Sequence, residues 1–167
     1  MSQENVEIVR ANFEAWNAGD MDAWGKRFDP DVIMRNPKGW PEPGPQVGRE
    51  AVLRFIGQLR DTWDADTLEV ISDYSDAADR VVVRFIWRGA GHGPESNIEL
   101  TGVYTVRNGR IFALEFFWDH AEALATVGMQ SRTSTPNPPD TNQSSRLAVA
   151  LRERQQRAGP VKHDRVP

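Results

Sequence analysis

The stretch that decides the fold is GRIFALEFFWDHAEALATVGM, residues 109–129. Asn108 and Gly109 form a dipeptide that is typical of a tight hairpin turn, with a valine-rich run before it and an aromatic run after it. Asp119 stands where the aromatic run stops, and its side chain can accept backbone N–H groups at the start of a helix. We therefore expect a strand that pairs with the preceding one, followed by a helix that ends at Gly128.

The N-terminal part of the chain predicts three helices. Residues 2–18 carry apolar side chains at spacings of three and four, which is one face of an amphipathic helix. Asp20 is a candidate cap for a short second helix, which the pair Asp29-Pro30 is expected to break. Residues 49–62 predict the third helix, because their apolar side chains fall on one stripe.

Strands are expected in the rest of the chain. Residues 67–74, 80–88 and 97–107 predict an antiparallel meander that leads into the last strand. A shorter strand is expected at 31–36. Residues 37–48 read PKGWPEPGPQVG, and this density of Pro and Gly predicts an irregular loop that serves as a rim or lid.

Period-2 alternation divides the long strands into two faces. One face is largely apolar and is the expected core face: Val81, Val83, Phe85, Trp87, Ile98, Leu100, Gly102, Tyr104, Val106, Phe112, Leu114, Phe116 and Trp118. The other face mixes apolar and charged side chains: Val82, Arg84, Ile86, Arg88, Glu99, Val103, Ile111, Glu115 and Phe117. A mixture of this kind is typical of an interface between subunits.

Composition limits the classes of partner. The chain has 167 residues and a net charge of −4, but residues 1–131 carry 13 basic and 21 acidic side chains, whereas the rest carry 7 and 3. An acidic domain disfavours polyanions, so we do not expect nucleic acid as a partner. Without cysteine the chain forms no disulfide, and its first residues lack the apolar run of a signal peptide or membrane span. We expect a cytoplasmic protein with no membrane partner.

The composition changes after Met129, where Pro, Ser, Thr and Asn replace apolar residues as in a linker. We therefore expect one domain at residues 1–130 and a linker with a basic C-terminal tail at 131–167. Residues 145–156 favour a short helix that would be marginal alone. A docked arm that reaches a partner subunit and an unfolded tail both remain open.

The hairpin turn, aromatic run, Asp, EAL and final Gly-Met of residues 109–129 resemble the C-terminal signature of SnoaL-like members of the NTF2-like superfamily. This resemblance covers the chain as far as about Met129. It implies an α+β cone in which three N-terminal helices pack on the concave face of a curved antiparallel sheet. It also implies a homodimer through the outer sheet face, since members often dimerise there, with a monomer as the alternative.

The resemblance also names positions at which to look for chemistry. In epoxide hydrolases and polyketide cyclases of the superfamily, a carboxylate on the last strand acts as general acid or base. The corresponding position here is Phe116, and Val83 and Phe85 occupy the positions of two further polar members of the epoxide hydrolase site. Epoxide hydrolysis is therefore not expected.

Two residues remain as candidate catalytic groups. Asn36 matches a pocket-wall Asn of the family and can both donate and accept hydrogen bonds. Tyr104 lies on the concave face and could donate to a carbonyl or an oxyanion, as a tyrosine does in steroid isomerases of the superfamily. Each has a structural alternative, because Asn36 could serve the turn before Pro37 and Tyr104 could be a packed core residue.

The histidines are weaker candidates. Asp119 and His120 are adjacent at a strand end, where neighbouring side chains point apart, so we do not expect them to form a catalytic dyad. The three histidines of the chain, including His92 in GAGHGP, show no metal-ligand spacing. We expect neither a metal nor a cofactor.

The strongest functional feature is an aromatic cavity inside the cone. Its expected lining residues are Met34, Trp40, Phe85, Trp87, Leu100, Leu114, Phe116 and Trp118, with Trp40 covering the opening. Such a pocket of at least ~300 Å³ would bind a small, largely apolar, ring-containing or carbonyl molecule, with cyclase, isomerase or dehydratase chemistry as the possible activity. In the alternative, the rings fill the cone, and the chain is a non-catalytic assembly or metabolite-sequestering module that meets a protein partner through its outer sheet face and tail.

Overall fold

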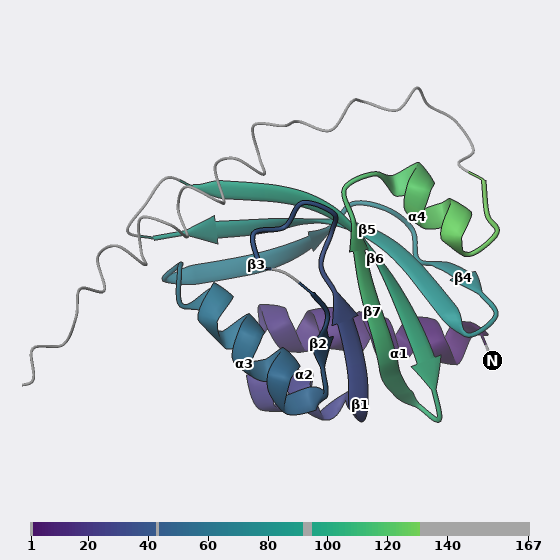
Figure 1. Cartoon of the computed structure of the whole chain (residues 1–167), viewed down its shortest axis with the longest axis horizontal. Coiled ribbons are helices and arrows are strands. Elements are labelled where there is room, and N and C mark those ends of the chain that lie inside the picture. The colour runs from purple at the N-terminus through teal and green to yellow at the C-terminus, as the bar shows by residue number, and fades with distance from the viewer. Residues whose placement is uncertain (1, 43, 92–94, 131–167) are drawn as a thin grey trace, which may run out of the picture.

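The computed structural model describes residues 2–42, 44–91 and 95–130, which form four helices and seven strands (Figure 1). The helices are α1 (Ser2–Asn17), α2 (Met21–Lys26), α3 (Arg49–Arg60) and α4 (His120–Thr126). The strands are β1 (Phe28–Arg35), β2 (Gln46–Val47), β3 (Ala65–Val70), β4 (Ser75–Ala77), β5 (Arg80–Ala90), β6 (Ser96–Arg107) and β7 (Arg110–Phe117).

All strands belong to one sheet with the order β2-β1-β7-β6-β5-β3, and β4 pairs with the first residues of β5. The antiparallel pairing of β3, β5, β6 and β7 confirms the predicted meander. The pairing of β1 with β7 is parallel, which the prediction of an antiparallel sheet did not include. Parallel neighbours need a long connection rather than a hairpin, so no local turn signal reveals such a pairing.

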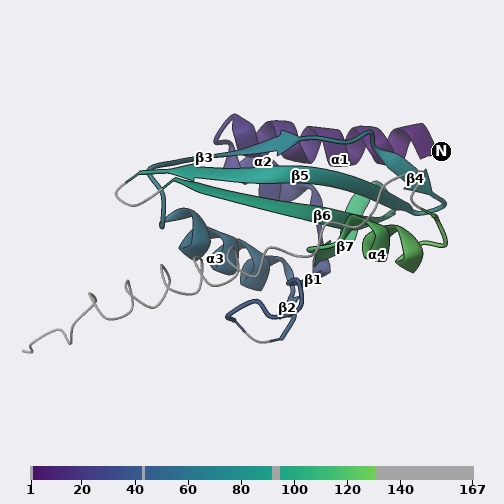
Figure 2. The ribbon, with the colours of Figure 1, turned by 90° about the horizontal axis from the view of Figure 1, so that it is seen from above.

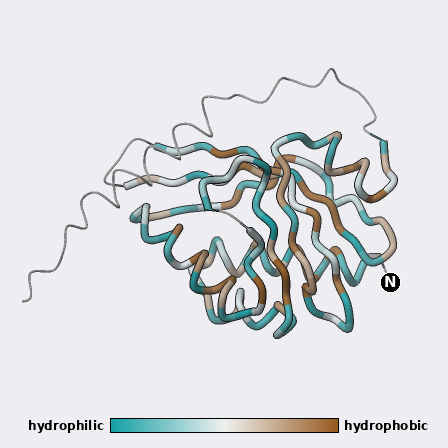
Figure 3. The backbone as a smooth tube through the Cα atoms, in the orientation of Figure 1, coloured by the Kyte–Doolittle hydropathy of each residue, from teal (hydrophilic) through white to brown (hydrophobic). Residues whose placement is uncertain are grey.

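Three helices share one face of the sheet, as predicted. Side chains of α1, α2 and α3 join the concave-face residues of the long strands in one hydrophobic cluster, which includes Val9, Trp24, Phe55 and Phe85. Figure 3 shows hydrophobic stretches along the strands in the middle of the molecule. None of the helices in the described part of the chain is long and apolar enough to cross a membrane.

The fourth helix lies on the opposite face. Ala123 and Leu124 of α4 form a second, smaller cluster with Val82 and Val103. Both views place α4 near β4 and the N-terminal end of α1, far from α3 (Figures 1 and 2). Val82 and Val103 were expected at a subunit interface, but α4 covers them and leaves them 0% and 5% exposed. Any interface on this face must use the part of the sheet that α4 leaves free.

Three helix boundaries follow from local capping. The Asp20 carboxylate accepts the backbone N–H of Ala23 at 3.0 Å, and the Asp119 carboxylate accepts that of Glu122 at 2.7 Å, so both predicted caps form. Gly128 has φ of +76°, the left-handed conformation that commonly ends a helix. The sequence therefore specified these ends through residues within one turn of each helix.

Some strand predictions were wrong where a strand bulges. Pro30 lies inside β1 rather than before it, and the register of β1 against β7 shifts between Phe28 and Ile33. Proline is tolerated at such an irregularity because the ladder there lacks a hydrogen bond. The β3 strand ends at Val70, four residues before the predicted end.

A second bulge reverses the predicted faces of two β7 residues. The register between β6 and β7 shifts between Thr105 and Val106. As a result Ile111, which was assigned to the outer face, is fully buried in the main core, whereas Phe112 is only half-buried and packs beneath the Arg107 guanidinium at 4.4 Å. An extra residue in one strand inverts the alternation beyond it. The predicted tail helix at 145–156 lies outside the described residues.

Candidate functional site

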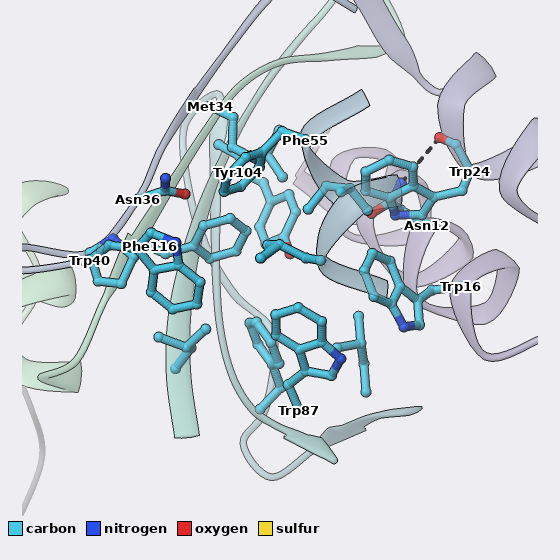
Figure 4. A pocket seen from close by; sticks show the side chains of 17 residues that line it. Asn12, Trp16, Trp24, Met34, Asn36, Trp40, Phe55, Trp87, Tyr104 and Phe116 are labelled. Carbon is cyan, nitrogen blue, oxygen red and sulfur yellow. Dashed lines mark hydrogen bonds between the residues drawn. The ribbon is translucent and has the colours of Figure 1, made fainter. Parts of the chain in front are cut away.

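A cavity of about 50 Å³ lies inside the cone, between α1, α2, α3 and the concave sheet face (Figure 4). Every helix and long strand that faces the cone contributes to it. Its lining residues are Asn12, Trp16, Trp24, Met34, Asn36, Pro37, Trp40, Phe55, Ile56, Leu59, Leu68, Phe85, Trp87, Leu100, Tyr104, Leu114 and Phe116.

The structure brings together almost all of the residues that the sequence indicated. Both candidate catalytic residues, Tyr104 and Asn36, line the cavity. So do the predicted wall residues Met34, Trp40, Phe85, Trp87, Leu100, Leu114 and Phe116. Trp118 is not part of the lining, because its ring stacks on Trp40 at a centroid distance of 6.0 Å. It therefore supports a wall residue.

The cavity is smaller than the sequence suggested. A volume of about 50 Å³ is well below the ~300 Å³ of ordinary ligand sites, and holds roughly three to five water molecules. Neighbouring rings occupy the rest of the cone. Trp16 lies 5.4 Å from Trp24 and 5.7 Å from Trp87 between ring centroids, and Phe85 lies 6.2 Å from Phe116. A ring-sized molecule thus enters only if part of the wall moves.

Tyr104 owes its position to a glycine. A Cβ atom at Gly102 would lie 2.6 Å from Cε2 of Tyr104 and 3.3 Å from its hydroxyl, so only glycine lets the ring lie along the sheet. The ring packs against Phe13 and Phe116 and is 2% exposed. Burial raises the pKa of Tyr104, so the hydroxyl stays protonated at neutral pH. None of the described residues hydrogen-bonds to it.

Asn36 directly follows β1, and its Nδ2 has no hydrogen-bond partner among the described residues. Three buried side-chain atoms of the described residues have none, and two of them, Asn36 Nδ2 and Trp16 Nε1, belong to residues that line the cavity. The third is Arg27 Nε. The turn after Asn36 closes through the Trp40 N–H, which donates to the Pro37 carbonyl at 3.0 Å. The Asn36 carboxamide takes no part in that bond, which argues against its alternative role as a turn residue.

Sequence reasoning missed Asn12, a third polar residue of the lining. It is 2% exposed, and its Nδ2 donates to the Trp24 carbonyl at a long 3.4 Å. None of the described residues donates a hydrogen bond to its Oδ1. The available signal was its place in α1, because Asn12 is three residues after Val9 and four before Trp16 and so interrupts the apolar stripe.

One carboxylate that the sequence analysis also missed orients two of the wall indoles. Asp66 accepts the Trp87 indole N–H at 2.9 Å and the Arg60 Nε–H at 2.8 Å. The Arg60 guanidinium in turn lies 4.8 Å from the centre of a Trp16 ring. The Asp66 side chain is 4% exposed, which makes this ion pair a buried one. The partners come from α3, β3 and β5, so no local sequence pattern could reveal them.

Trp40 closes one side of the cavity through few contacts. Besides its stack on Trp118, the loop is held by the Trp118 indole N–H, which donates to the Lys38 carbonyl at 2.9 Å. The Trp40 indole N–H donates within the loop, to the Glu42 carboxylate at 3.2 Å. We call residues 37–42 the Trp40 loop. Segments with few tertiary contacts open at low cost in free energy.

His120 serves the opposite face of the sheet. Its Nδ1 lies 3.1 Å from the Thr101 hydroxyl, while the adjacent Asp119 caps α4. Burial, and secondarily the nearby Arg84, lower the pKa of His120, and Asp119 and Glu99 partly oppose this shift. His92 lies outside the described residues. Within the described ranges, no three or more His, Cys, Asp or Glu side chains cluster as metal ligands would.

The lining determines what chemistry the cavity allows. Its described residues are apolar or aromatic apart from Asn12 and Asn36, the Tyr104 hydroxyl and the tryptophan N–H groups. Phe116 and Phe85 line it at the positions where the resemblance places polar groups of an epoxide hydrolase. The polar groups of the lining, which are the two carboxamides, the Tyr104 hydroxyl and the indole N–H groups, can form hydrogen bonds and polarise a carbonyl. They are poor proton carriers at neutral pH.

A curved sheet with three helices over its concave face and an apolar cavity between them is the architecture of NTF2-like proteins. Residues 9–114 match the SnoaL-like domain. This match spans more than half of the chain, and the protein therefore belongs to the SnoaL-like family. Among curated proteins, none matches the sequence at a significant level.

Several solved structures share the fold. An NTF2-like protein of unknown function from Burkholderia pseudomallei has a TM-score of 0.61 and 24% identity, covering 74% of this chain and 97% of that one. A candidate polyketide cyclase from Sinorhizobium meliloti has a TM-score of 0.56 and 27% identity, covering 66% and 93%. TerC, co-crystallised with polyporic acid, has a TM-score of 0.61 and 20% identity, covering 74% and 97%.

Proposed function

We propose that this protein binds a small, uncharged, largely apolar molecule with a carbonyl oxygen inside the cone. In this proposal the Tyr104 hydroxyl and the Asn36 carboxamide hold the oxygen. One observation carries it: the aromatic cavity contains polar side chains that lack partners among the described residues. Buried polar groups are nearly always hydrogen-bonded, and an unmet one costs about 1–3 kcal/mol. A ligand oxygen would satisfy them.

A purely structural core does not account for these groups. Phenylalanine at position 104 would fill the same space and leave no hydroxyl to satisfy. The same reasoning applies to Asn36, whose Nδ2 is buried among apolar side chains. The presence of these two polar groups therefore favours a role toward a bound molecule.

Access requires a movement, since the closed cavity has only about 50 Å³. The Trp40 loop is attached to Trp118 through one stack and one hydrogen bond, and Trp40 also packs against the main cluster. Its displacement would expose Phe116 and Asn36 and enlarge the cavity to the size of a ring. The bound ring would then replace the contacts with the cavity wall that Trp40 loses.

Should a reaction follow binding, it would be a cofactor-independent isomerisation or cyclisation, in which Tyr104 and Asn36 polarise the carbonyl and the aromatic wall excludes water. The likeness to a candidate polyketide cyclase and to TerC, which was crystallised with polyporic acid, points in the same direction. A protein that sequesters such a molecule without turnover would use the same pocket.

The test measures the binding of cyclohexanone by saturation-transfer NMR. We expect the wild-type protein to bind and Tyr104→Phe to weaken binding roughly two- to tenfold, the usual worth of one hydrogen bond. Tyr74→Phe is the matched control, because Tyr74 is the chain's other tyrosine and lies outside this cavity. Absence of binding to the wild type, or equal affinity in all three proteins, would refute the proposal.

We also propose a homodimer through the part of the outer face that α4 leaves free. Half-buried Ile86 lies there beside the ion pair of Arg84 with Glu99. Apolar contacts flanked by charged pairs are typical of such interfaces. Light scattering should give twice the mass of the chain for the wild type and a smaller mass for Ile86→Lys. A monomeric wild type would leave this face to another protein partner, as in the alternative assembly module.

A further inference from the structure

In the view of Figure 4, the three polar groups of the cavity follow one another in a line across it. Figure 4 shows Asn36 at one side of the pocket, Asn12 at the opposite side and Tyr104 between them. They come from the end of β1, from α1 and from β6, so the fold holds them on three separate elements. A bound molecule that fills the pocket would reach both ends of this line.

The two ends offer opposite hydrogen-bonding groups. At one end the free group is an N–H donor, Asn36 Nδ2, and the neighbouring Tyr104 hydroxyl can also donate. At the other end Asn12 already uses its Nδ2 toward the Trp24 carbonyl, which leaves Oδ1 as an acceptor. The bond to Trp24 fixes this orientation of the carboxamide. The acceptor of the cavity is therefore at the Asn12 side, where the Trp16 indole N–H, unpaired among the described residues, is a further donor (Figure 4).

From this arrangement we infer that the ligand is an uncharged hydroxy-ketone: a compact ring whose carbonyl accepts from Asn36 and Tyr104 and whose hydroxyl, across the ring, donates to Asn12. This inference rests on the proposed function and adds the substrate class and a third binding residue. The lining contains no Asp, Glu, His, Lys or Arg among the described residues. A carboxylate or ammonium group would lose its hydration there without a counter-charge, which excludes charged ligands of this size.

The experiment compares 4-hydroxycyclohexanone with 4-methylcyclohexanone, which has the same shape but a methyl group in place of the hydroxyl. In an apolar pocket without an acceptor the methyl compound binds better, because burying an unpaired hydroxyl is unfavourable. We expect the wild-type protein to prefer the hydroxyl compound by about two- to tenfold in affinity, measured by saturation-transfer NMR titration. Asn12→Leu should reverse this preference.

Asn5→Leu is the matched control. Asn5 lies on the same helix and makes the same kind of bond, from its Nδ2 to the Ala78 carbonyl at 3.4 Å, but outside the cavity. It should keep the wild-type preference. A role of Asn12 that is only structural would change stability without changing the ratio between the two compounds.

The possible outcomes distinguish failure of the hydroxy-ketone inference from failure of the proposed carbonyl-binding function. Binding of all three cyclohexanones with a preference for the methyl compound in the wild type overturns the hydroxy-ketone assignment and leaves the carbonyl pocket standing. An unchanged ratio in Asn12→Leu overturns the role of Asn12. Absence of binding by any of the three compounds overturns both proposals. Because the wild-type comparison needs no variant, the test holds even if Asn12→Leu fails to fold.

Discussion

The two faces of the sheet treat their polar groups differently. On the outer face, Thr101 meets His120 of α4, and Arg84 meets Glu99 on the exposed part of the sheet, so these polar side chains are paired within the chain. On the concave face, Tyr104 and the Nδ2 atom of Asn36 lie among aromatic rings without a partner in the described residues. A structural role is sufficient to account for polar groups that are paired within the chain. The unpaired ones identify the face at which a ligand is to be sought.

The largest expected loss of unfolding free energy comes from truncating a side chain packed on one of the two faces of the sheet. Trp87→Ala removes an indole that lies in the centre of the main cluster and should cost about 3–5 kcal/mol of unfolding free energy. Leu124→Ala, in the small cluster beneath α4, should cost about 2 kcal/mol, because the short helix can settle onto the sheet. Urea unfolding followed by circular dichroism measures both. Equal losses would mean that α4 supports the fold as strongly as the cone does.

A smaller loss is expected for Asp66→Asn, which removes the charge that holds Arg60 and Trp87. We expect the unfolding free energy to fall by about 1.5–3 kcal/mol, the range for hydrogen bonds to a charged group. Asp22→Asn is the control, because the Asp22–Lys26 pair is exposed at 78% and 73% and water screens it, so its loss should leave the unfolding free energy nearly unchanged. Urea unfolding gives the two losses, and tryptophan emission shows whether the wall indoles lose their order. A control as costly as the buried variant would contradict this reasoning.

Gly102→Ala should disturb the packing of the Tyr104 ring on the concave face and leave the outer face unchanged. The added Cβ meets the Tyr104 ring at 2.6 Å, and overpacking of this kind costs about 1–3 kcal/mol. Gly57→Ala on α3 is the matched control, since its Cβ meets nothing within 4 Å and should stabilise the helix by about 0.5–1 kcal/mol. Melting temperatures of the two variants should therefore move in opposite directions. If Gly102→Ala kept both wild-type stability and cyclohexanone affinity, Tyr104 would not depend on the space above Gly102.

The smallest effect concerns pH and the outer face. The pKa of His120 lies below its ordinary value of 6.5 in the folded chain, so the unfolded chain binds a proton at higher pH than the folded one does. Stability that is present above pH 6.5 is therefore lost as the pH falls through the lower folded pKa. His120→Gln should reduce this loss, measured as the difference in melting temperature between pH 7.5 and pH 5.5. An identical difference in wild type and variant would show that His120 does not contribute.

The sequence was informative where the cause is local. Asp20 and Asp119 cap helices through atoms three residues away, and the turn at Asn108 and Gly109 joins β6 to β7 as predicted. The alternation of β5 and β6 correctly assigned Phe85 and Tyr104 to the cavity side. For these residues a few neighbouring positions determine the outcome.

The sequence was insufficient where the cause is distant. The burial of Ile111 depends on a bulge in the pairing of β6 with β7, and the role of Asp66 depends on partners from two other elements. Asn12 could have been found as a polar residue inside an apolar stripe, but its free oxygen depends on the position of the Trp24 carbonyl. The size of the cavity could not be predicted at all, because it is the small space that remains after all the rings have packed.

The central claim is that the unpaired polar groups of the cone hold a ligand oxygen, and a crystal structure of the protein grown with cyclohexanone tests it most directly. The account predicts density for the ring in the cone, its carbonyl within hydrogen-bonding distance of the Tyr104 hydroxyl or Asn36 Nδ2, and Trp40 displaced from Trp118. A closed cone at saturating cyclohexanone, with Trp40 still stacked on Trp118 and ordered water bonded to Tyr104 and Asn36, would contradict it.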